Sequence, residues 1–406
     1  MKKLLIAALL MLPLCSLSAK TKKAIYIIVD GIPADVIERI NTPNIDEISS
    51  LGGYSKMQMG GIIGGYSQTP TISAVCYNAL LTGTWSNKNN VWDNSITAPN
   101  YNYHTMFRIA KSQKKDVKTA VYSTWLDNRT KLVGVNINEN GNFDVDRYFD
   151  GLENDKTNYP NEKENLQIFK IDEAVTDKAA QEIREYAPDL TWVYLQYNDD
   201  AGHLFGNGEK FDKTVVDADN QVGRIWESVK YRQKNFNEDW MVAVVTDHGR
   251  KDDGYGHGGQ SARERTVWLA TNVKVNSFFS NQARASVDLA PSMCRWMGFE
   301  VPKNIKYEWD GVPFIGKESI FNLQAKQQND GSVKLFWENF NPKENLTVYY
   351  TLTNNYKEGK DDEWIIAGKA KAGDNKFIIN QDIAKNGFLK IHIEGKNSSA
   401  NCWWKK

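Results

Sequence analysis

The sequence is poor in features that would place a protein in a specialised class. Its 406 residues carry 50 lysines and arginines against 50 aspartates and glutamates, so it has neither a basic surplus nor an acidic tail. Nucleic-acid polymers are bound largely by neutralising their phosphates with basic side chains, so this balance argues against them as partners. Hydrophobic residues at 41% and charged residues at 25% argue against wholesale disorder, a coiled coil and a collagen-like fibre.

Long hydrophobic runs are also lacking. One apolar run, residues 4–14, follows two lysines at the start of the chain and is too short to span a bilayer comfortably. Together with the small residues up to Ala19, it is typical of a secretory signal peptide. We therefore expect residues 1–19 to be a signal peptide and the mature protein to be periplasmic or secreted, with no membrane span. Lipid attachment at Cys15 is the alternative, which the bulky residue before it disfavours.

Cysteines are few and do not form the dense framework of a small disulfide-rich domain. After the signal peptide, Cys76, Cys294 and Cys402 remain, an odd number spread across the chain. This distribution argues against a fold that depends on disulfides, despite the expected export, and it allows one pair among the three.

Between residues 23 and 314, apolar runs alternate with amphipathic stretches, and the chain is long enough for two or three domains. The apolar runs suit strands buried on both faces of a parallel sheet: 24–29, 119–123, 191–196, 240–246 and 266–270. Helical patterns accompany them at 34–40, 73–81, 173–185, 214–231 and 287–297. This order predicts an α/β fold with a mostly parallel central sheet sandwiched by helices. Two Asn-rich stretches, 86–103 and 135–165, are predicted to be long loops near one end of the sheet.

The pattern changes after about residue 316. The side chains at 333, 335 and 337, and those at 389, 391 and 393, alternate with polar or opposite-face residues, and further short runs occupy 345–353 and 364–367. This spacing predicts a small antiparallel β-sandwich of fibronectin or immunoglobulin type over residues 317–406, which leaves 20–316 for the α/β domain. We expect the sandwich to pack against the α/β domain or to bind glycan or a surface. Trp403 and Trp404 are candidates for a sugar platform, although core packing is favoured.

Three of the apolar strands run into an acidic residue. Asp30 follows the first run directly, Asp247 follows the run that ends at 246, and Asp199 lies three residues after the run that ends at 196. The carboxyl ends of strands in an open α/β sheet form the edge where binding sites lie. We therefore expect these carboxylates, far apart in sequence, to converge.

Histidines are scarce, with five in the whole chain, and three of them fall in the same segments. His203 lies four residues after Asp199, with a glycine between them, His248 follows Asp247, and His257 lies in a glycine-rich loop nine residues further on. Carboxylates and imidazoles are the ligand types of a two-metal centre, and six such buried groups without a metal would be costly to desolvate. The other two histidines, His104 and His392, receive no metal role.

The motifs that contain these residues resemble those of the alkaline phosphatase superfamily, and most closely those of its nucleotide pyrophosphatase/phosphodiesterase branch. They occur in the family's order over residues 24–314, as Asp30-Gly31, Pro70-Thr71-Ile72-Ser73 leading to Leu81-Thr82-Gly83, Asp199 to His203, Asp247-His248-Gly249, and His257. The resemblance implies an alkaline phosphatase-like fold and a metal-dependent phosphoric ester hydrolase with two Zn²⁺ per chain. It assigns one zinc to Asp30, Asp247 and His248 and the other to Asp199, His203 and His257.

The resemblance also implies a nucleophile, Ser73, that contacts the metal. The family places a Ser or Thr at the start of a helix, nine residues before the Thr of a Thr-Gly pair, and counting back from Thr82 reaches Ser73. Thr69 and Thr71 are rivals that do not keep this spacing. A helix N-terminus presents free N–H groups and the positive end of a dipole to a phosphate.

Two further residues match family positions. Asn94 lies twenty-one residues after Ser73, where the family has an Asn that contacts a non-bridging phosphate oxygen. Tyr194 lies five residues before Asp199, where the family has an aromatic residue that stacks on a nucleobase, although an ordinary strand aromatic is an equal alternative.

Departures from the family leave the substrate open. Ala74 stands where nucleotide-cleaving members usually have a Phe that sandwiches the base, which puts nucleotide specificity in doubt. The short loop to His257 looks more like that of the ethanolamine-phosphate transferases of the superfamily. A sulfatase needs a Cys-x-Pro-x-Arg motif, and Cys76 is followed by Tyr-Asn-Ala-Leu, so this activity is disfavoured.

We therefore expect an exported two-zinc phosphohydrolase that acts on a small phosphate ester through a covalent phosphoserine, most consistent with a phosphodiesterase or nucleotide pyrophosphatase. A phosphomonoesterase is the alternative. Monoesterases of the superfamily add a cationic group that balances the extra negative charge of their substrate. Arg250, Lys251 and Arg263 lie near the Asp-His-Gly segment, although solvated loop charges or salt-bridge partners are the favoured interpretation. A non-catalytic exported binding protein is a third candidate. The sequence indicates no particular oligomeric state.

Overall fold

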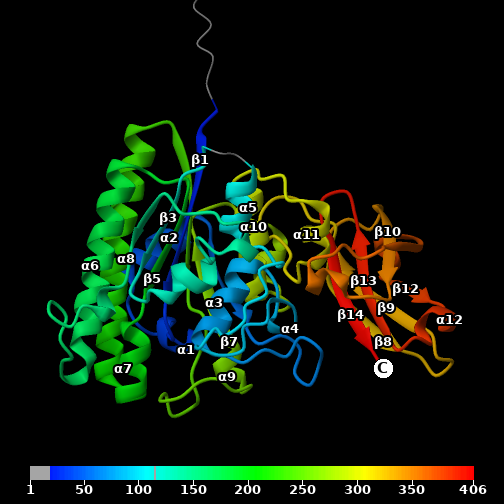
Figure 1. Cartoon of the computed structure of the whole chain (residues 1–406), viewed down its shortest axis with the longest axis horizontal. Helices are drawn as coiled ribbons and strands as arrows, with labels where there is room; N and C mark the ends of the chain where they lie inside the picture. The colour runs from blue at the N-terminus through cyan, green and yellow to red at the C-terminus, as the bar shows by residue number, and fades with distance from the viewer. Residues whose placement is uncertain (1–18, 114–115) are drawn as a thin grey trace, which may run out of the picture.

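The computed structural model describes residues 19–113 and 116–406, and a seven-stranded sheet lies between the helices of its α/β part, beside the C-terminal strands (Figure 1). The strand order is β2-β7-β6-β1-β5-β3-β4. The strands are β1 (Thr21–Val29), β2 (Gly53–Gln58), β3 (Thr119–Ser123), β4 (Arg147–Phe149), β5 (Leu190–Leu195), β6 (Glu238–Val245) and β7 (Thr266–Thr271). All pairs from β6 across to β4 are parallel, whereas β7 runs antiparallel to both β6 and β2. The prediction of a mostly parallel central sheet is confirmed.

Helices cover both faces of this sheet, and β1 shows why its strands are continuously apolar. Its side chains at 24, 26 and 28 belong to one core and those at 25, 27 and 29 to the other, because successive strand residues point to opposite faces. One core includes α3 (Ser73–Thr82), α5 (Met106–Gln113) and α10 (Leu289–Trp296). The other includes α1 (Ala34–Ile37), α2 (Pro43–Leu51), α6 (Leu166–Glu185) and α8 (Glu209–Asn235).

Several elements of the α/β part do not appear among those expected from the sequence. The edge strands β2 and β4 are half-exposed or only three residues long, so they lack a continuous apolar run. The Asn-rich stretches contain β4 and short helical turns rather than loop alone. The remaining helices are α4 (Ser86–Asn89), α7 (Tyr197–Phe205), α9 (Ala262–Arg265), α11 (Lys303–Glu308) and α12 (Gln381–Ala384). A π-helical turn spans Asn128–Val133, and 3-10 turns span Asn138–Asn140, Leu152–Asn154, Lys163–Asn165, Ser277–Ser280, Ser286–Asp288, Asn355–Glu358 and Ala372–Asp374.

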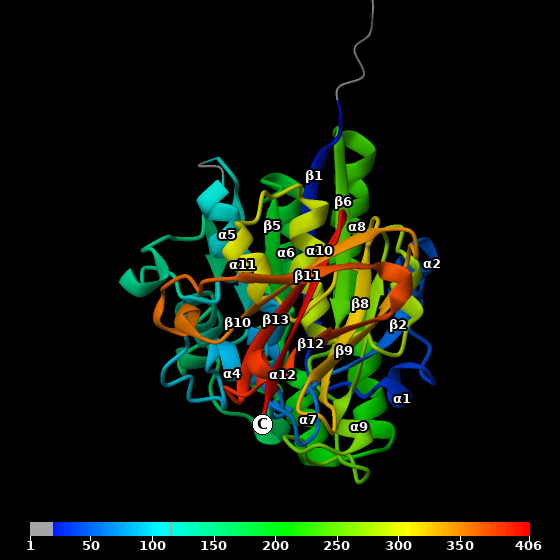
Figure 2. The same ribbon diagram turned by 90° about the vertical axis from the view of Figure 1, so that its right-hand side faces the viewer.

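The C-terminal part consists of two antiparallel sheets around a third core (Figure 2). One has the order β12-β9-β8, with β8 (Ile320–Gln327), β9 (Val333–Asn339) and β12 (Lys376–Ile379). The other has the order β11-β10-β13-β14, with β10 (Asn345–Thr351), β11 (Ile365–Lys371), β13 (Phe388–Glu394) and β14 (Ser399–Lys405). This agrees with the expected antiparallel arrangement. The boundary at residue 316 and the fibronectin or immunoglobulin type stay predictions.

A cluster of buried charges joins the C-terminal sheets to the α/β part, and we call it the interface cluster: Lys88, Lys390, Glu308, Asp310 and Asp362. The ammonium of Lys88 lies 2.7 Å from a carboxylate oxygen of Asp310. That of Lys390 lies 2.5 Å from Glu308 and 2.7 Å from Asp362. Each carboxylate therefore contacts a lysine.

Of the two tryptophans near the C-terminus, Trp403 lies at this junction and Trp404 belongs to the core of the C-terminal sheets. Trp404 is 6% exposed, and the ring of Trp403 stacks on Tyr66 with centroids 5.7 Å apart. Neither indole offers the open platform that a sugar would need, so both take part in packing, as the favoured interpretation held.

The remaining expectations concern the chain start, the membrane and the cysteines. The predicted signal peptide covers residues 1–19. All of it except Ala19 lies outside the described residues, and so does Cys15. Across the described ranges, no helix combines the length and the apolar character needed to cross a membrane. Cys76, Cys294 and Cys402 are buried free thiols, so the pair that the sequence allowed is absent between them.

Candidate metal centre

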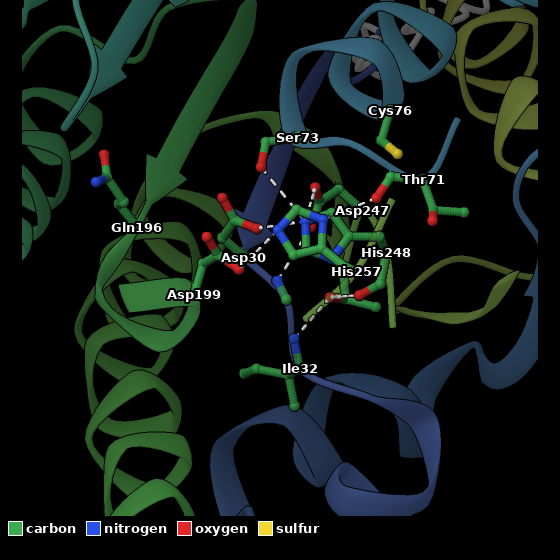
Figure 3. A network of polar contacts seen from close by, with 12 residues as sticks. Asp30, Ile32, Thr71, Ser73, Cys76, Gln196, Asp199, Asp247, His248 and His257 are labelled. Atoms are coloured by element: carbon green, nitrogen blue, oxygen red, sulfur yellow. Dashed lines mark hydrogen bonds and ion pairs between the residues drawn. The ribbon is translucent and has the colours of Figure 1, made fainter. Parts of the chain in front are cut away.

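Three neighbouring strands bring the predicted acidic residues to one edge of the sheet. Asp30 follows β1, Asp247 follows β6, and Asp199 lies in α7, just after β5. Because β1 pairs in parallel with both β5 and β6, the three strands end side by side. Figure 3 shows these carboxylates turned toward the rings of His248 and His257. The structure therefore brings together acidic residues from three distant parts of the sequence.

Asp30, Asp247 and His248 form the first group, and all three are essentially inaccessible to solvent. Atom Nε2 of His248 lies 3.4 Å from Oδ1 of Asp30 and 3.3 Å from Oδ2 of Asp247. Strand β6 ends at Val245, so the adjacent residues Asp247 and His248 are free of strand alternation and both reach the same centre. The next residue, Gly249, lies so close to a backbone carbonyl that a Cβ atom would not fit.

Asp199, His203 and His257 form the second group, which lies closer to solvent. Atom Nε2 of His203 lies 3.3 Å from Oδ2 of Asp199 and 3.1 Å from Nε2 of His257, and the latter lies 3.5 Å from Oδ1 of Asp199. Asp199 and His203 are both on helix α7, and residues four apart share one helix face. The rings of His248 and His257 stack 3.7 Å apart, so the two groups adjoin.

The histidines present the form that binds a metal. Atom Nδ1 of His248 lies 3.0 Å from the carbonyl oxygen of Gly249, and Nδ1 of His257 lies 2.8 Å from that of Thr71. When Nδ1 donates to a carbonyl, Nε2 keeps a lone pair, as in ligating histidines. Burial lowers the pKa of both rings, which favours the neutral form that coordinates a cation.

Among the described residues, no lysine or arginine forms an ion pair with the carboxylates of the first group. Atom Oδ1 of Asp30 and Oδ2 of Asp247 are buried and accept no hydrogen bond from any described residue. Burial, and then the charge of Asp247, raises the pKa of Asp30 well above its usual range, and burial raises the pKa of Asp247 to about 7. Unpaired buried charge is costly, and it is relieved by a metal cation. Within the described residues, Asp30, Asp247 and His248 lie close enough together to share an ion, and so do Asp199 and His257 together with His248. His203 adjoins this second set, with its Nε2 3.3 Å from Asp199 and 3.1 Å from His257. Carboxylate and imidazole donors of this kind suit zinc.

Ser73 is the first residue of α3, and its hydroxyl reaches the first group. Its Oγ lies 3.3 Å from Nε2 of His248, and the residue is 7% exposed (Figure 3). The rivals Thr69 and Thr71 use their hydroxyls elsewhere, donating to backbone carbonyls at 3.0 and 2.9 Å. Of the three candidates, Ser73 is therefore the one whose hydroxyl oxygen contacts a member of the two groups.

Asn94 lies on the exposed loop after α4, and its side chain reaches the start of the same helix. Its Oδ1 accepts a hydrogen bond of 3.0 Å from the backbone N–H of Ala74. The side-chain amide is thereby fixed beside Ser73, and its Nδ2 group is left as a donor.

The structure assigns Tyr194 a contact with a carboxylate rather than with open space. Its ring is 2% exposed within β5, and its hydroxyl donates to Oδ2 of Asp30 at 2.7 Å. The buried ring has no free face for a nucleobase, so the geometry favours the alternative of a strand aromatic. Tyr77 in α3, which sequence reasoning missed, also donates to Oδ2 of Asp30. Its position four residues after Ser73, on the face of α3 toward the sheet, was the signal that could have indicated it.

The three basic side chains near the Asp-His-Gly segment lie in different environments. Arg250 is 1% exposed and forms an ion pair with Asp199. Arg263 lies 3.1 Å from Asp35, and Lys251 is exposed. Burial of Asp199 acts to raise its pKa. The hydrogen bond with His203 and then the charge of Arg250 act in the opposite direction, and the pKa of Asp199 is lowered. Arg250 is thus a salt-bridge partner, one of the two interpretations that the sequence favoured.

Comparison with known proteins identifies one family and several related folds. Residues 24–350 match the model of the type I phosphodiesterase / nucleotide pyrophosphatase family. A sulfatase structure given as a 2-O GAG sulfatase has 12% identity and a TM-score of 0.50, and the match covers 90% of this chain and 86% of that one. A provisionally named sulfatase from Bacteroides thetaiotaomicron has 12% identity and a TM-score of 0.51, over 95% of this chain and 85% of that one.

A murine ectonucleotide pyrophosphatase / phosphodiesterase 5 is 12% identical, with a TM-score of 0.49 over 70% of this chain and 97% of that one. The two sulfatase structures share the fold with this chain, and at such low identity they indicate nothing about its substrate. A search among curated proteins finds no match.

Proposed function

The chain belongs to the type I phosphodiesterase / nucleotide pyrophosphatase family, and from this premise we propose that it is an exported two-zinc phosphodiesterase that acts through a covalent phosphoserine. Membership of the family makes the protein a phosphoric ester hydrolase. One observation carries the finer proposal: the Ser73 hydroxyl lies 3.3 Å from Nε2 of His248, which also approaches Asp30 and Asp247. A nucleophile next to unpaired carboxylates is the arrangement that a metal-activated serine requires.

The proposed zinc ligands are the two groups. Asp30, Asp247 and His248, with Ser73 as a further ligand, would hold one ion, and Asp199, His203 and His257 would hold the other. Bound zinc supplies positive charge that lowers the pKa of a coordinated hydroxyl or water and stabilises the oxygen of a leaving group.

The chain's own residues provide the nucleophile and its surroundings. The Ser73 oxygen loses its proton to water and attacks phosphorus, an O–P bond forms, and the bond to the leaving group breaks in line with it. Water then attacks the phosphoserine, which releases the phosphate product and restores the hydroxyl. The N-terminal end of α3 favours the negative phosphate, and the Nδ2 group of Asn94 donates to a non-bridging oxygen.

The hydrogen bonds that Arg250 makes within the protein support a diester substrate over a monoester. A monoester carries an extra negative charge, and enzymes that prefer it place a cation against the phosphate. Arg250 is 1% exposed and donates to Asp199 and to backbone carbonyls. Its guanidinium is therefore not available to contact a substrate phosphate. Among the described residues, no other lysine or arginine forms an ion pair with either group.

Substitution of the nucleophile tests the proposal. The Ser73→Ala variant should retain about two zincs per chain and lose turnover of bis(p-nitrophenyl) phosphate by about a thousandfold or more. Metal content is measured by plasma emission spectrometry, and the monoester p-nitrophenyl phosphate is assayed in parallel. Ser50→Ala, on the exposed face of α2, is the matched control and should behave like the wild type. Full turnover in Ser73→Ala would reject the assignment, and a strong preference for the monoester would reject the diesterase.

A further inference from the structure

A buried arginine lies behind the proposed zinc ligands and bonds to the chain around them. The guanidinium of Arg250 donates from Nε to the carbonyl of Gly31 at 3.0 Å and from Nη1 to that of Tyr255 at 3.3 Å. Its Nη2 donates to the carbonyl of Asp199 at 2.8 Å and to the Oδ1 atom of the same residue. Every bond is thus made to a protein oxygen, and the residue is 1% exposed.

Arg250 and its partners are adjacent to, or part of, the four segments that carry the proposed carboxylate and histidine ligands. Gly31 follows Asp30, Asp199 is itself a proposed ligand, and Tyr255 precedes His257 by two residues. Arg250 in turn follows His248 by two residues. One planar cation therefore joins the end of β1, helix α7, the Asp-His-Gly segment and the glycine-rich loop.

Two glycines make room for this side chain. A Cβ atom on Gly202, in the middle of α7, would overlap the guanidinium carbon. A Cβ atom on Gly31, whose φ is +65°, would lie 2.7 Å from Nη2 of Arg250. Glycine weakens a helix relative to alanine, so its presence within α7 is explained by the need to admit Arg250.

The guanidinium also fixes the orientation of the Asp199 carboxylate. It contacts Oδ1, which leaves Oδ2 on the side of His203, 3.3 Å from Nε2 of that ring. Arginine is always charged and donates from a rigid fork, so it holds this geometry in a way that a single ammonium group cannot. The buried charge is in turn balanced by Asp199 and by three carbonyl oxygens.

We propose that Arg250 is a positioning residue that preorganises the second group and so controls the occupancy of the second zinc site. The inference rests on the proposed function, because it concerns the ligands assigned there. Removal of the fork frees Asp199 and the loop of His257, whereas the first group keeps its three members. The second zinc is therefore lost before the first.

Zinc binding by full-length variants tests this directly. Each protein is loaded with zinc, and its metal content and the dissociation constant of each site are measured by emission spectrometry and chelator competition. We expect about two zincs in the wild type and about one in Arg250→Met, with second-site affinity about 10- to 100-fold weaker. Arg250→Lys, which keeps the charge without the fork, should recover part of this loss. Arg263→Met removes a neighbouring arginine that pairs with Asp35 and should bind zinc like the wild type.

The outcomes are distinguishable. Two zincs of wild-type affinity in Arg250→Met overturn the positioning role, and equal weakening of both sites overturns its selectivity. If Arg250→Met does not fold by circular dichroism, Arg250→Lys decides: a weakened second site supports the proposal and wild-type affinity overturns it. A folded wild type that binds no zinc overturns the proposed function itself.

Discussion

Two groups of buried charges lie in this molecule, and they are built in opposite ways. In the interface cluster, Lys88 and Lys390 face three carboxylates, each of which contacts a lysine within 2.7 Å. In the first group of the candidate centre, no lysine or arginine among the described residues pairs with Asp30 or Asp247, whose basic neighbour is His248, and each has a buried oxygen that accepts no hydrogen bond. Every carboxylate of the interface cluster has a lysine beside it, although Oε2 of Glu308 also accepts no hydrogen bond from a described residue, whereas the carboxylates of the first group have no such cation and call for one from outside.

This difference separates a structural role from a functional one. Burial is nearly total in both places, so burial alone does not mark a site. What distinguishes the candidate centre is that its buried carboxylates Asp30 and Asp247 have no lysine or arginine beside them among the described residues, and burial raises the pKa of both. Removal of a charged side chain should therefore have opposite effects on stability at the two sites: it should not destabilise the metal-free candidate centre, but it should destabilise the interface cluster.

The largest effect is expected from Asp30→Asn. Loss of a proposed first-site ligand should abolish zinc binding there and reduce diester turnover by about a thousandfold or more. Because the pKa of Asp30 is raised in the metal-free fold, its charge opposes folding, so the free energy of unfolding of the metal-free variant should be unchanged or higher. Turnover assays and urea unfolding in the presence of chelator measure the two effects. A metal-free variant clearly less stable than the wild type would mean that Asp30 is paired in a way the structure does not show.

Lys390→Met should have the complementary effect at the interface cluster. It leaves Glu308 and Asp362 buried without their lysine, and breaking a buried pair in this way costs about 3–5 kcal/mol. Urea unfolding should show this loss, while the folded variant should keep its zinc content and its turnover. Lys385→Met, which removes an exposed lysine from the same sheet region, is the control and should leave stability nearly unchanged. An equally stable Lys390→Met protein would remove the contrast between the two clusters.

Zinc removal from the wild type should have a smaller effect on stability. Metal that binds only the folded chain stabilises it by about 2.7 kcal/mol at a free concentration one hundred times the dissociation constant. We expect thermal unfolding at a lower temperature after chelation and recovery on addition of zinc. The Lys390→Met variant should show the same shift, because Lys390 contacts none of the proposed zinc ligands. Identical melting with and without zinc would contradict the expected role of the unpaired carboxylates.

The smallest effect concerns Asp172 in α6, a third kind of buried carboxylate. It accepts hydrogen bonds from the backbone N–H groups of Gln196 and Tyr197, at the start of α7, and no lysine or arginine among the described residues pairs with it. Burial raises the pKa of Asp172 to about 7, above its value in the unfolded chain. Its contribution to stability is therefore complete below about pH 4 and declines as pH rises to about 7.

Asp172→Asn does not titrate, so the stability of the wild type relative to this variant should fall across that interval. Urea unfolding at several pH values, with chelator present, measures the difference. A difference in stability that stays constant with pH would show that the pKa of Asp172 is the same in the folded and unfolded chains.

The sequence predicted the proposed ligands because they follow strands whose order can be inferred. Asp30 and Asp247 come after continuous apolar runs, and parallel strands end at one edge of the sheet. The spacing from Ser73 to Thr82 has a physical basis in the structure, since these residues are the first and last of α3 and Gly83 ends the helix with a φ of +67°. Such local patterns survive in a single sequence.

Other features depend on contacts between distant segments and leave no local pattern. Arg250 bonds to Gly31 across 219 residues, and its burial follows from glycines in two other elements. The hydroxyl of Tyr194 meets Asp30 through strand pairing, which its sequence position does not reveal. The edge strands β2 and β4 are short or half-exposed, so hydrophobic periodicity does not define them.

In the proposed function, the unpaired carboxylates and the histidines hold two zinc ions that the reaction needs. The most direct test is the metal content of the purified wild-type protein, measured with its turnover of bis(p-nitrophenyl) phosphate before and after chelation. We predict about two zincs per chain, loss of turnover with the metal, and recovery when zinc is restored. A folded protein that contains no zinc after loading, or that retains full turnover without it, would contradict the account.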